Sequence, residues 1–113
     1  MPVKFLNRDK VIALLTERAK KLLAEREEVL KVMLFGSIAQ GRQIPGSDAD
    51  LLIEISYTNE SHWFRRGSEY IDCFLNELVP VELFIYTSEE LRRMTAGNNS
   101  FIKRILQTGI RLS

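Results

Sequence analysis

Two aspartates separated by one residue, Asp48 and Asp50, are the first feature of this sequence that indicates chemistry. They directly precede an apolar run, residues 51–55, which is typical of a buried strand. Residues two apart in a strand share a face, so both carboxylates are expected to point the same way. Neighbouring carboxylates repel unless a cation neutralises them, and Mg²⁺ binds one or two protein carboxylates together with substrate phosphates. The pair therefore predicts a magnesium site beside a phosphate-bearing ligand.

A glycine turn upstream of the aspartates supplies features that a triphosphate needs. Gly36 and Ser37 follow a second apolar run, residues 32–35, which predicts a buried strand that ends in a turn. Glycine lets the backbone approach a ligand closely, and serine is a good first residue for a helix. If a short helix starts at Ser37, its N-terminal amides would face an anion.

Each motif taken alone has an ordinary structural interpretation. A glycine-serine pair is most often a simple turn, and an Asp-x-Asp pair is most often solvated charge. The combination is more informative, because ten residues separate the two motifs and apolar runs flank both. Together they predict a nucleotide site that holds phosphates and metal side by side.

The two motifs at this spacing resemble the signature of the nucleotidyltransferase superfamily related to DNA polymerase beta. Three neighbouring features resemble its minimal nucleotidyltransferase (MNT) branch: Gly41, Ser47 and Leu51-Leu52. Many members of that branch are antitoxin partners of HEPN-domain toxins. The resemblance covers about residues 11–112. It implies a third carboxylate on a later strand, and Glu82 in the run 81–86 is the candidate.

The resemblance implies a role for each of these residues. Asp48, Asp50 and Glu82 would hold one or two Mg²⁺ ions, with Glu82 alternatively accepting the proton of the attacking hydroxyl. The remaining candidates would bind the nucleotide, the first two of them at its outer phosphates: Gly36, Ser37, Arg42 and Ser47. The family often has arginines where this chain has Ile38 and Gln40, and Arg42 is the candidate to substitute for them.

The predicted reaction is transfer of a nucleoside monophosphate from an NTP to a hydroxyl, with release of pyrophosphate. The resemblance implies ATP as the donor and a tyrosine of a cognate HEPN toxin as the acceptor, so that the protein acts as an antitoxin. Two alternatives stay open: an MNT-like antitoxin that neutralises its partner by contact alone, and a nucleotide-sensing module. Five intact site residues favour an enzyme, because packing alone does not need them: Gly36, Ser37, Asp48, Asp50 and Glu82.

Composition bounds the class of protein. The 113 residues fit a single domain, 1–113, of which 45% are hydrophobic and 27% are charged. The net charge of +1 gives no basic patch that would indicate a nucleic acid partner. The apolar runs are too short to span a membrane, and the single cysteine, Cys73, fits a reducing compartment, so we expect a cytoplasmic protein. The oligomeric state stays open, including a homo-oligomer.

Hydrophobic periodicity and capping residues predict the elements that position the site. Strands are expected over residues 31–35, 49–55 and 81–86, with a short edge strand at 110–112. Helices are expected over about 7–30, a broken segment at 62–78, and two short helices after Thr87 and after Asn98 or Asn99. Ser68 is expected to restart the broken helix after Gly67. His62 is interpreted as a surface residue and Cys73 as a packing residue. The predicted fold is α/β (α+β), a small mixed sheet with helices packed on it.

Overall fold

A four-stranded mixed sheet forms the centre of the fold in the computed structural model, which describes residues 7–113, without the side chains of Trp63 and Phe64. The strands run in the order β3-β2-β1-β4, and their bounds are β1 Val29–Phe35, β2 Ala49–Ile55, β3 Val81–Thr87 and β4 Ile110–Arg111. β2 pairs antiparallel with β1 and parallel with β3, and β4 pairs antiparallel with β1. This topology confirms the predicted mixed sheet and its edge strand.

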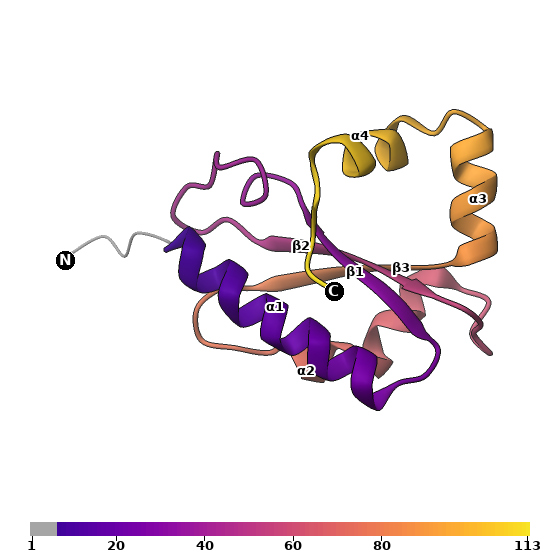
Figure 1. Cartoon of the computed structure of the whole chain (residues 1–113), viewed down its shortest axis with the longest axis horizontal. Helices are drawn as coiled ribbons and strands as arrows, with labels where there is room; N and C mark the ends of the chain where they lie inside the picture. Colours follow the sequence, from indigo (N-terminus) through magenta and orange to yellow (C-terminus); the bar gives the residue numbers. More distant parts are fainter. Residues whose placement is uncertain (1–6) are drawn as a thin grey trace.

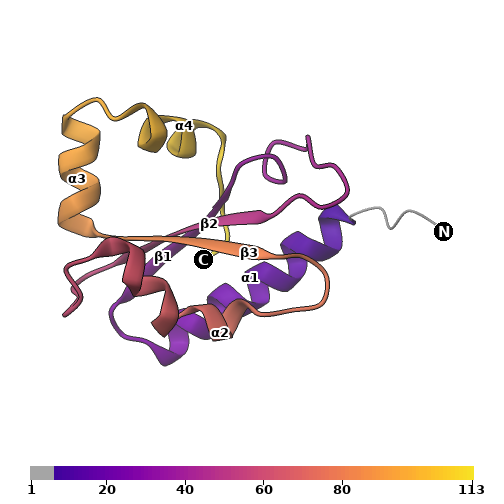
Figure 2. The same cartoon turned by 180° about the vertical axis from the view of Figure 1, so that it is seen from behind.

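Helices lie on both faces of the sheet (Figure 1). The long helix α1 (Arg8–Glu25) and the short α2 (Ile71–Phe74) lie below the sheet in that view, together with a 3₁₀ helix, η1 (Trp63–Glu69). The helices α3 (Ser88–Ala96) and α4 (Ser100–Thr108) lie above it, and the reverse view keeps this arrangement (Figure 2). None of the described helices is both long enough and apolar enough to cross a membrane.

The main core lies between α1 and one face of the sheet. Alternate residues of β2 face this core, as the period of two in the sequence predicted. They belong to one buried cluster with the apolar stripe of α1, and both sets are almost completely buried: Ala49, Leu51, Ile53 and Ile55 from β2, and Val11, Leu15, Ala19 and Leu22 from α1. This packing fixes which face each β2 residue presents, and it directs Asp50 to the opposite face.

The opposite face of the sheet carries a smaller core beneath α4. Ile102 and Ile105 of α4 are buried there against Met33, Phe35 and Leu52 of the sheet. Three phenylalanine rings meet in this core with centroid separations of 5.3 to 5.7 Å, one from each of three elements: Phe35, Phe84 and Phe101. The contact anchors α4 over the strand ends where the predicted site residues lie.

The helix starts follow the predicted capping signals. The side chain of Asn7 caps α1, and that of Asn99 caps α4. At α3, Thr87 and Glu90 form the predicted capping box, with each side chain accepting a hydrogen bond from the backbone N–H of the other. Asn99, rather than Asn98, is therefore the cap of the last helix.

The first helix is shorter than the sequence predicted. It ends at Glu25 instead of near Leu30, and β1 begins at Val29 instead of Lys31. Glu28 explains the difference, because its carboxylate is buried and accepts hydrogen bonds from Arg26 and from the Tyr70 hydroxyl at 2.7 Å. Tertiary contacts of this kind override a sequence that is otherwise compatible with helix.

The predicted broken helix over residues 62–78 is also only partly confirmed. Helical structure occupies 63–69 as a 3₁₀ helix and 71–74 as a single α-turn, and residues 75–80 are not helical. The predicted restart at Ser68 is wrong, since its hydroxyl donates to the carbonyl of Arg65 and Tyr70 precedes the new helix. Phe74 is fully buried, whereas Leu78 is exposed and does not extend the apolar stripe.

Candidate active site

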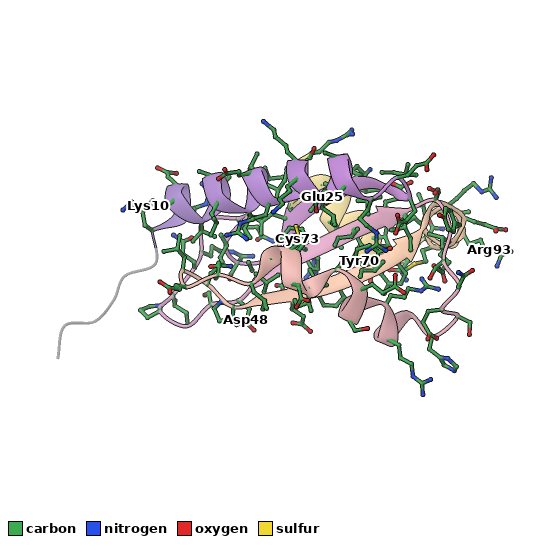
Figure 3. The ribbon with its side chains drawn as sticks, turned by 90° about the horizontal axis from the view of Figure 1, so that it is seen from below. Lys10, Glu25, Asp48, Tyr70, Cys73 and Arg93 are labelled. Atoms are coloured by element: carbon green, nitrogen blue, oxygen red, sulfur yellow. The ribbon has the colours of Figure 1, made fainter. Side chains whose placement is uncertain are left out.

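The three strand ends nearest the predicted site lie side by side. In the sheet register, Asp50 of β2 is paired with Phe35 of β1 on one side and with Glu82 of β3 on the other. Register partners on adjacent strands face the same way, so the two carboxylates lie on one face. Asp48 immediately precedes β2, and its side chain lies at the same end of the molecule as Lys10 at the start of α1 (Figure 3).

Gly36 brings the backbone against the carboxylate of Asp50. Its φ of +84° lies in the left-handed region that favours glycine. An added Cβ at Gly36 would stand 2.5 Å from Oδ2 of Asp50, which is closer than real side chains allow. The glycine is therefore required both by the backbone angle and by the neighbouring acid. This contact joins the two sequence motifs in space.

The segment after Gly36 forms consecutive turns rather than the predicted short helix. The N–H of Gln40 donates to the carbonyl of Gly36, and the N–H of Arg42 donates to that of Ser37 at 2.8 Å. Ile38 is fully buried in the main core, and Gly41 has a φ of +72°. The turn follows a path that buries Ile38, so a contact between this side chain and a phosphate is excluded.

Arg8 braces the same turn from the first residue of α1. Its Nε donates to the carbonyl of Ile38 at 2.7 Å, and its Nη2 donates to the carbonyl of Ala39 at 2.9 Å. These carbonyls lie in a segment without regular helical bonding. The guanidinium therefore adds a second hydrogen bond to the carbonyl of Ile38, which also accepts from the N–H of Gly41, and supplies one to the carbonyl of Ala39.

Asp50 is the site residue whose ionised form is disfavoured by its surroundings. Burial raises the pKa of its carboxyl to about 6, and the nearby carboxylates of Glu82 and Asp48 add to the effect. A site that raises the pKa of one acid through its neighbours favours an added positive charge. Asp50 is therefore the acid on which the charges of both neighbouring carboxylates act.

The donor set fits a hard divalent cation that is bound jointly with a ligand. Among residues 7–113, no three His, Cys, Asp or Glu side chains already form a group that could hold a metal ion. The structure instead presents Asp50 and Glu82 as neighbours, with Asp48 close enough to affect Asp50. One or two carboxylates completed by substrate phosphates are the usual protein contribution to a Mg²⁺ site. The three-carboxylate metal site stays a prediction.

A pocket of about 490 Å³ opens beside the glycine turn. One wall is the turn itself, and the other is α4. The residues that line it are Phe35, Gly36, Ser37, Gln40, Arg42, Phe101, Arg104, Ile105 and Thr108. The volume lies within the range of about 300 to 1,000 Å³ that small-molecule sites occupy. Asp50 borders the pocket through its contact with Gly36.

The predicted nucleotide-binding residues divide into two groups. Gly36, Ser37 and Arg42 line the pocket, and a side-chain nitrogen of Arg42 donates to Gln40. Ser47 is not among the lining residues. Its Oγ accepts a hydrogen bond from the N–H of Ile44 at 2.9 Å and so shapes the connecting loop.

The α4 wall was missed by the sequence interpretation. Phe101, Arg104, Ile105 and Thr108 follow one another at helical spacing, and this spacing is the only sequence signal that could have placed them on one face. A hydrogen bond of 3.5 Å from Gln40 to the Thr108 hydroxyl links the two walls.

The other candidate reactive residues lie outside this site. The thiol of Cys73 donates to the carbonyl of Arg18, and burial raises the pKa of this thiol, which agrees with a packing role. His62 is an exposed residue at the start of η1 whose Nδ1 lies 3.2 Å from a carboxylate oxygen of Glu60. Neither residue lines the pocket.

Comparisons with known proteins give the chain a family. The family model described as "Polymerase beta, Nucleotidyltransferase" matches residues 17–113. A protein of Methanocaldococcus jannaschii, whose name gives it a proposed protein adenylyltransferase activity, is 26% identical over 90 residues. That match covers 78% of this chain and 80% of the relative.

Two solved structures share the fold. A proposed nucleotidyltransferase from Sulfolobus solfataricus has a TM-score of 0.59 at 22% identity and covers 76% of this chain and 75% of its own. A toxin–antitoxin structure with AMP-PNP has a TM-score of 0.57 at 20% identity, covering 87% of this chain and 72% of its own. These likenesses confirm the architecture that the sequence predicted.

Proposed function

Because the chain belongs to the polymerase beta nucleotidyltransferase family, we propose that it transfers AMP from ATP to a hydroxyl on a partner protein. The observation that carries the proposal is the approach of Gly36 to Asp50 at the edge of the pocket. It puts a backbone turn that could receive phosphates next to Asp50, the carboxylate whose pKa is raised. Such an arrangement serves a ligand that brings phosphates and a cation together.

Asp48, Asp50 and Glu82 are the residues that would hold Mg²⁺. Held there, Mg²⁺ would supply neutralisation of the charge that develops on the transferred group. The chain's own contribution is to pair Asp50 with Glu82 across two strands and to place Ser37 in the wall of the pocket that would receive the phosphates. This is catalysis by positioning and electrostatics, in which the acceptor oxygen displaces pyrophosphate from the α-phosphorus.

Glu82 is also available as the proton acceptor. It lies exposed on the edge strand β3, where an acceptor hydroxyl from outside the chain can reach it. An ionised carboxylate already serves as a base at neutral pH, provided that it lies within hydrogen-bond reach of the hydroxyl. Variants of Glu82 would show whether this carboxylate binds the metal or accepts the proton.

The proposed acceptor is a tyrosine of a cognate HEPN-domain toxin. The relative from M. jannaschii is named for protein adenylyltransferase activity, and one structural neighbour is a toxin–antitoxin complex with AMP-PNP. These names support a protein acceptor and a toxin partner, and the HEPN class rests on the resemblance of the sequence motifs. In this proposal, modification of a toxin residue is the means by which the chain neutralises its partner.

The test is co-expression with the HEPN-domain protein encoded nearest to this chain, followed by mass spectrometry. The partner should gain the mass of one AMP, and label from the α-phosphate of ATP should enter it while label from the γ-phosphate should not. The double variant Asp48→Ala, Asp50→Ala should abolish the gain. Asp72→Ala is the matched control, because Asp72 is an exposed aspartate on α2. An unmodified toxin that the double variant still neutralises would establish neutralisation by contact alone.

A further inference from the structure

The α4 wall of the pocket presents a cationic side chain without a described partner. Arg104 lines the pocket opposite the glycine turn, and its guanidinium makes no ion pair or hydrogen bond with the side chains described within residues 7–113. Most other arginines near the core are engaged, as Arg8 and Arg66 are by backbone carbonyls. An unpaired arginine that faces a pocket is available to a ligand.

The direction of Arg104 is fixed by the packing of its own helix. Ile105, the next residue, is 1% exposed and anchors α4 in the smaller core. Phe101 and Thr108 lie three residues before and four residues after Arg104, so the three side chains share one face of the helix. All three line the same pocket. The burial of Ile105 therefore fixes the orientation of α4, and with it the pocket-facing side of the helix from which Arg104 extends.

The pocket suits an anion rather than a second cation. Its lining includes two arginines, Arg42 and Arg104, and no aspartate or glutamate. Gly36 and Ser37 form part of the opposite wall, and the backbone amides of such a turn are effective anion ligands. The acids of the site lie next to the pocket, beyond Gly36. The charges are thus segregated, with a basic pocket on one side of the glycine and an acidic cluster on the other.

We propose that Arg104 binds the outer phosphates of the nucleotide across the pocket from Ser37. The inference rests on the proposed function, because it assumes a nucleoside triphosphate at this site. Arginine matches the geometry of phosphate oxygens with two parallel N–H donors, which gives it strength and direction. In this arrangement α4 closes the phosphate site, and Arg42 is a secondary contact because it already donates to Gln40.

The test measures binding, without an acceptor protein, in the full chain with Mg²⁺ present. Arg104→Ala should lower the affinity for ATP and for inorganic tripolyphosphate by about 10- to 100-fold, because a pair of charge-assisted hydrogen bonds is lost. AMP, which lacks the outer phosphates, should bind the variant and the wild type within about twofold. Arg104→Lys should recover part of the loss, because lysine keeps the charge but not the paired donors.

The matched control is Arg92→Ala, which removes the same charge from an exposed position on α3 outside the pocket. It should leave all three affinities unchanged. Equal weakening of ATP and AMP by Arg104→Ala would overturn the proposal in favour of a contact to the nucleoside, and unchanged ATP binding would overturn it outright. Failure of the wild-type chain to bind ATP would instead reject the proposed function together with this inference.

Discussion

Oδ2 of Asp50 occupies the space into which a side chain on Gly36 would extend, 2.5 Å from an ideal Cβ at that position. Two motifs ten residues apart in sequence are thereby in direct contact in the fold. The contact explains why a glycine is needed at this strand end for reasons beyond the turn itself. Any larger residue must displace either the backbone or the carboxylate.

Gly36→Ala is expected to impair nucleotide binding more than its backbone strain alone would. The suitable control is Gly46→Ala, because Gly46 has a similar φ of +89° and an added Cβ there would meet nothing within 4 Å. Both substitutions should cost about 1 to 2 kcal/mol in free energy of unfolding from left-handed strain. Only Gly36→Ala should also lower the affinity for Mg-ATP, which titration calorimetry would measure. Equal Mg-ATP affinities in the two variants would contradict a role for the Gly36–Asp50 contact.

Asp50→Asn is expected to stabilise the metal-free protein at pH 7. Burial and the neighbouring acids raise the pKa of Asp50 to about 6, above the value of 3.8 for a free aspartate. The folded state therefore holds this proton more tightly than the unfolded state, so the ionised form lowers stability at pH above about 6. The penalty disappears as the pH falls from about 6 to below 4.

Thermal melts in EDTA at several pH values would measure this effect. The melting temperature of Asp50→Asn should exceed that of the wild type at pH 7, and the difference should shrink toward pH 4. Asp72→Asn serves as the control, since Asp72 is exposed on α2. A wild type that melts at a higher temperature than Asp50→Asn at pH 7 in EDTA would show that ionised Asp50 does not lower stability.

Much of the scaffold could be predicted from the sequence, because local patterns determined it. The alternation of apolar residues in 49–55 gave β2 its bounds and its buried face. The Thr87–Glu90 capping box located the start of α3. Glu82, which pairs with Asp50 across β2 and β3, was a candidate only because the family resemblance implied a third carboxylate on a later strand. For β2 and α3 the decisive information lay within a few neighbouring residues.

What the sequence did not reveal depends on contacts between distant segments. The end of α1 is set by Glu28, whose carboxylate is buried by Tyr70 from a different part of the chain. The turn after Ser37 departs from a helix because Ile38 enters the core. The α4 wall faces the glycine turn only because the last helix returns over the sheet, as Figure 2 shows. Arg104 consequently carried no local signal of function.

Glu90→Gln is expected to reduce stability by about 1 to 3 kcal/mol through the loss of a charge beside buried Arg66. Arg66 is only 4% exposed and donates to both carboxylate oxygens of Glu90, at 2.6 and 3.2 Å. Glutamine can still complete the capping box with Thr87, so the helix start should survive. The hydrogen bonds from Arg66 are the leading cause that lowers the pKa of Glu90 below its usual 4.5.

The pH dependence of this variant distinguishes the ion pair from a general packing defect. A depressed carboxyl pKa contributes stability above about pH 4.5, and that contribution is lost as the pH falls through the lower folded-state value. The gap in unfolding free energy between wild type and Glu90→Gln should therefore close in acid, as urea titrations would show. Glu89→Gln is the control, since its pair with Arg93 is exposed and worth less than about 1 kcal/mol. A gap that persists in acid would contradict the ion pair as the cause.

Arg8→Ala is expected to weaken nucleotide binding without removing any group that contacts the nucleotide. The guanidinium donates to the carbonyls of Ile38 and Ala39 and so holds the turn whose other side lines the pocket. Loss of these bonds should loosen the turn, raising the KM for ATP several-fold with a smaller change in kcat, because the carboxylates on β2 and β3 stay in place. Lys10→Ala is the control, since Lys10 is exposed and lies only two residues further along α1. Added guanidinium at millimolar concentration should partly restore the KM of Arg8→Ala and should not affect Lys10→Ala. A matching rise of KM in both variants, or a loss confined to kcat, would show that Arg8 does not position the phosphate-binding turn.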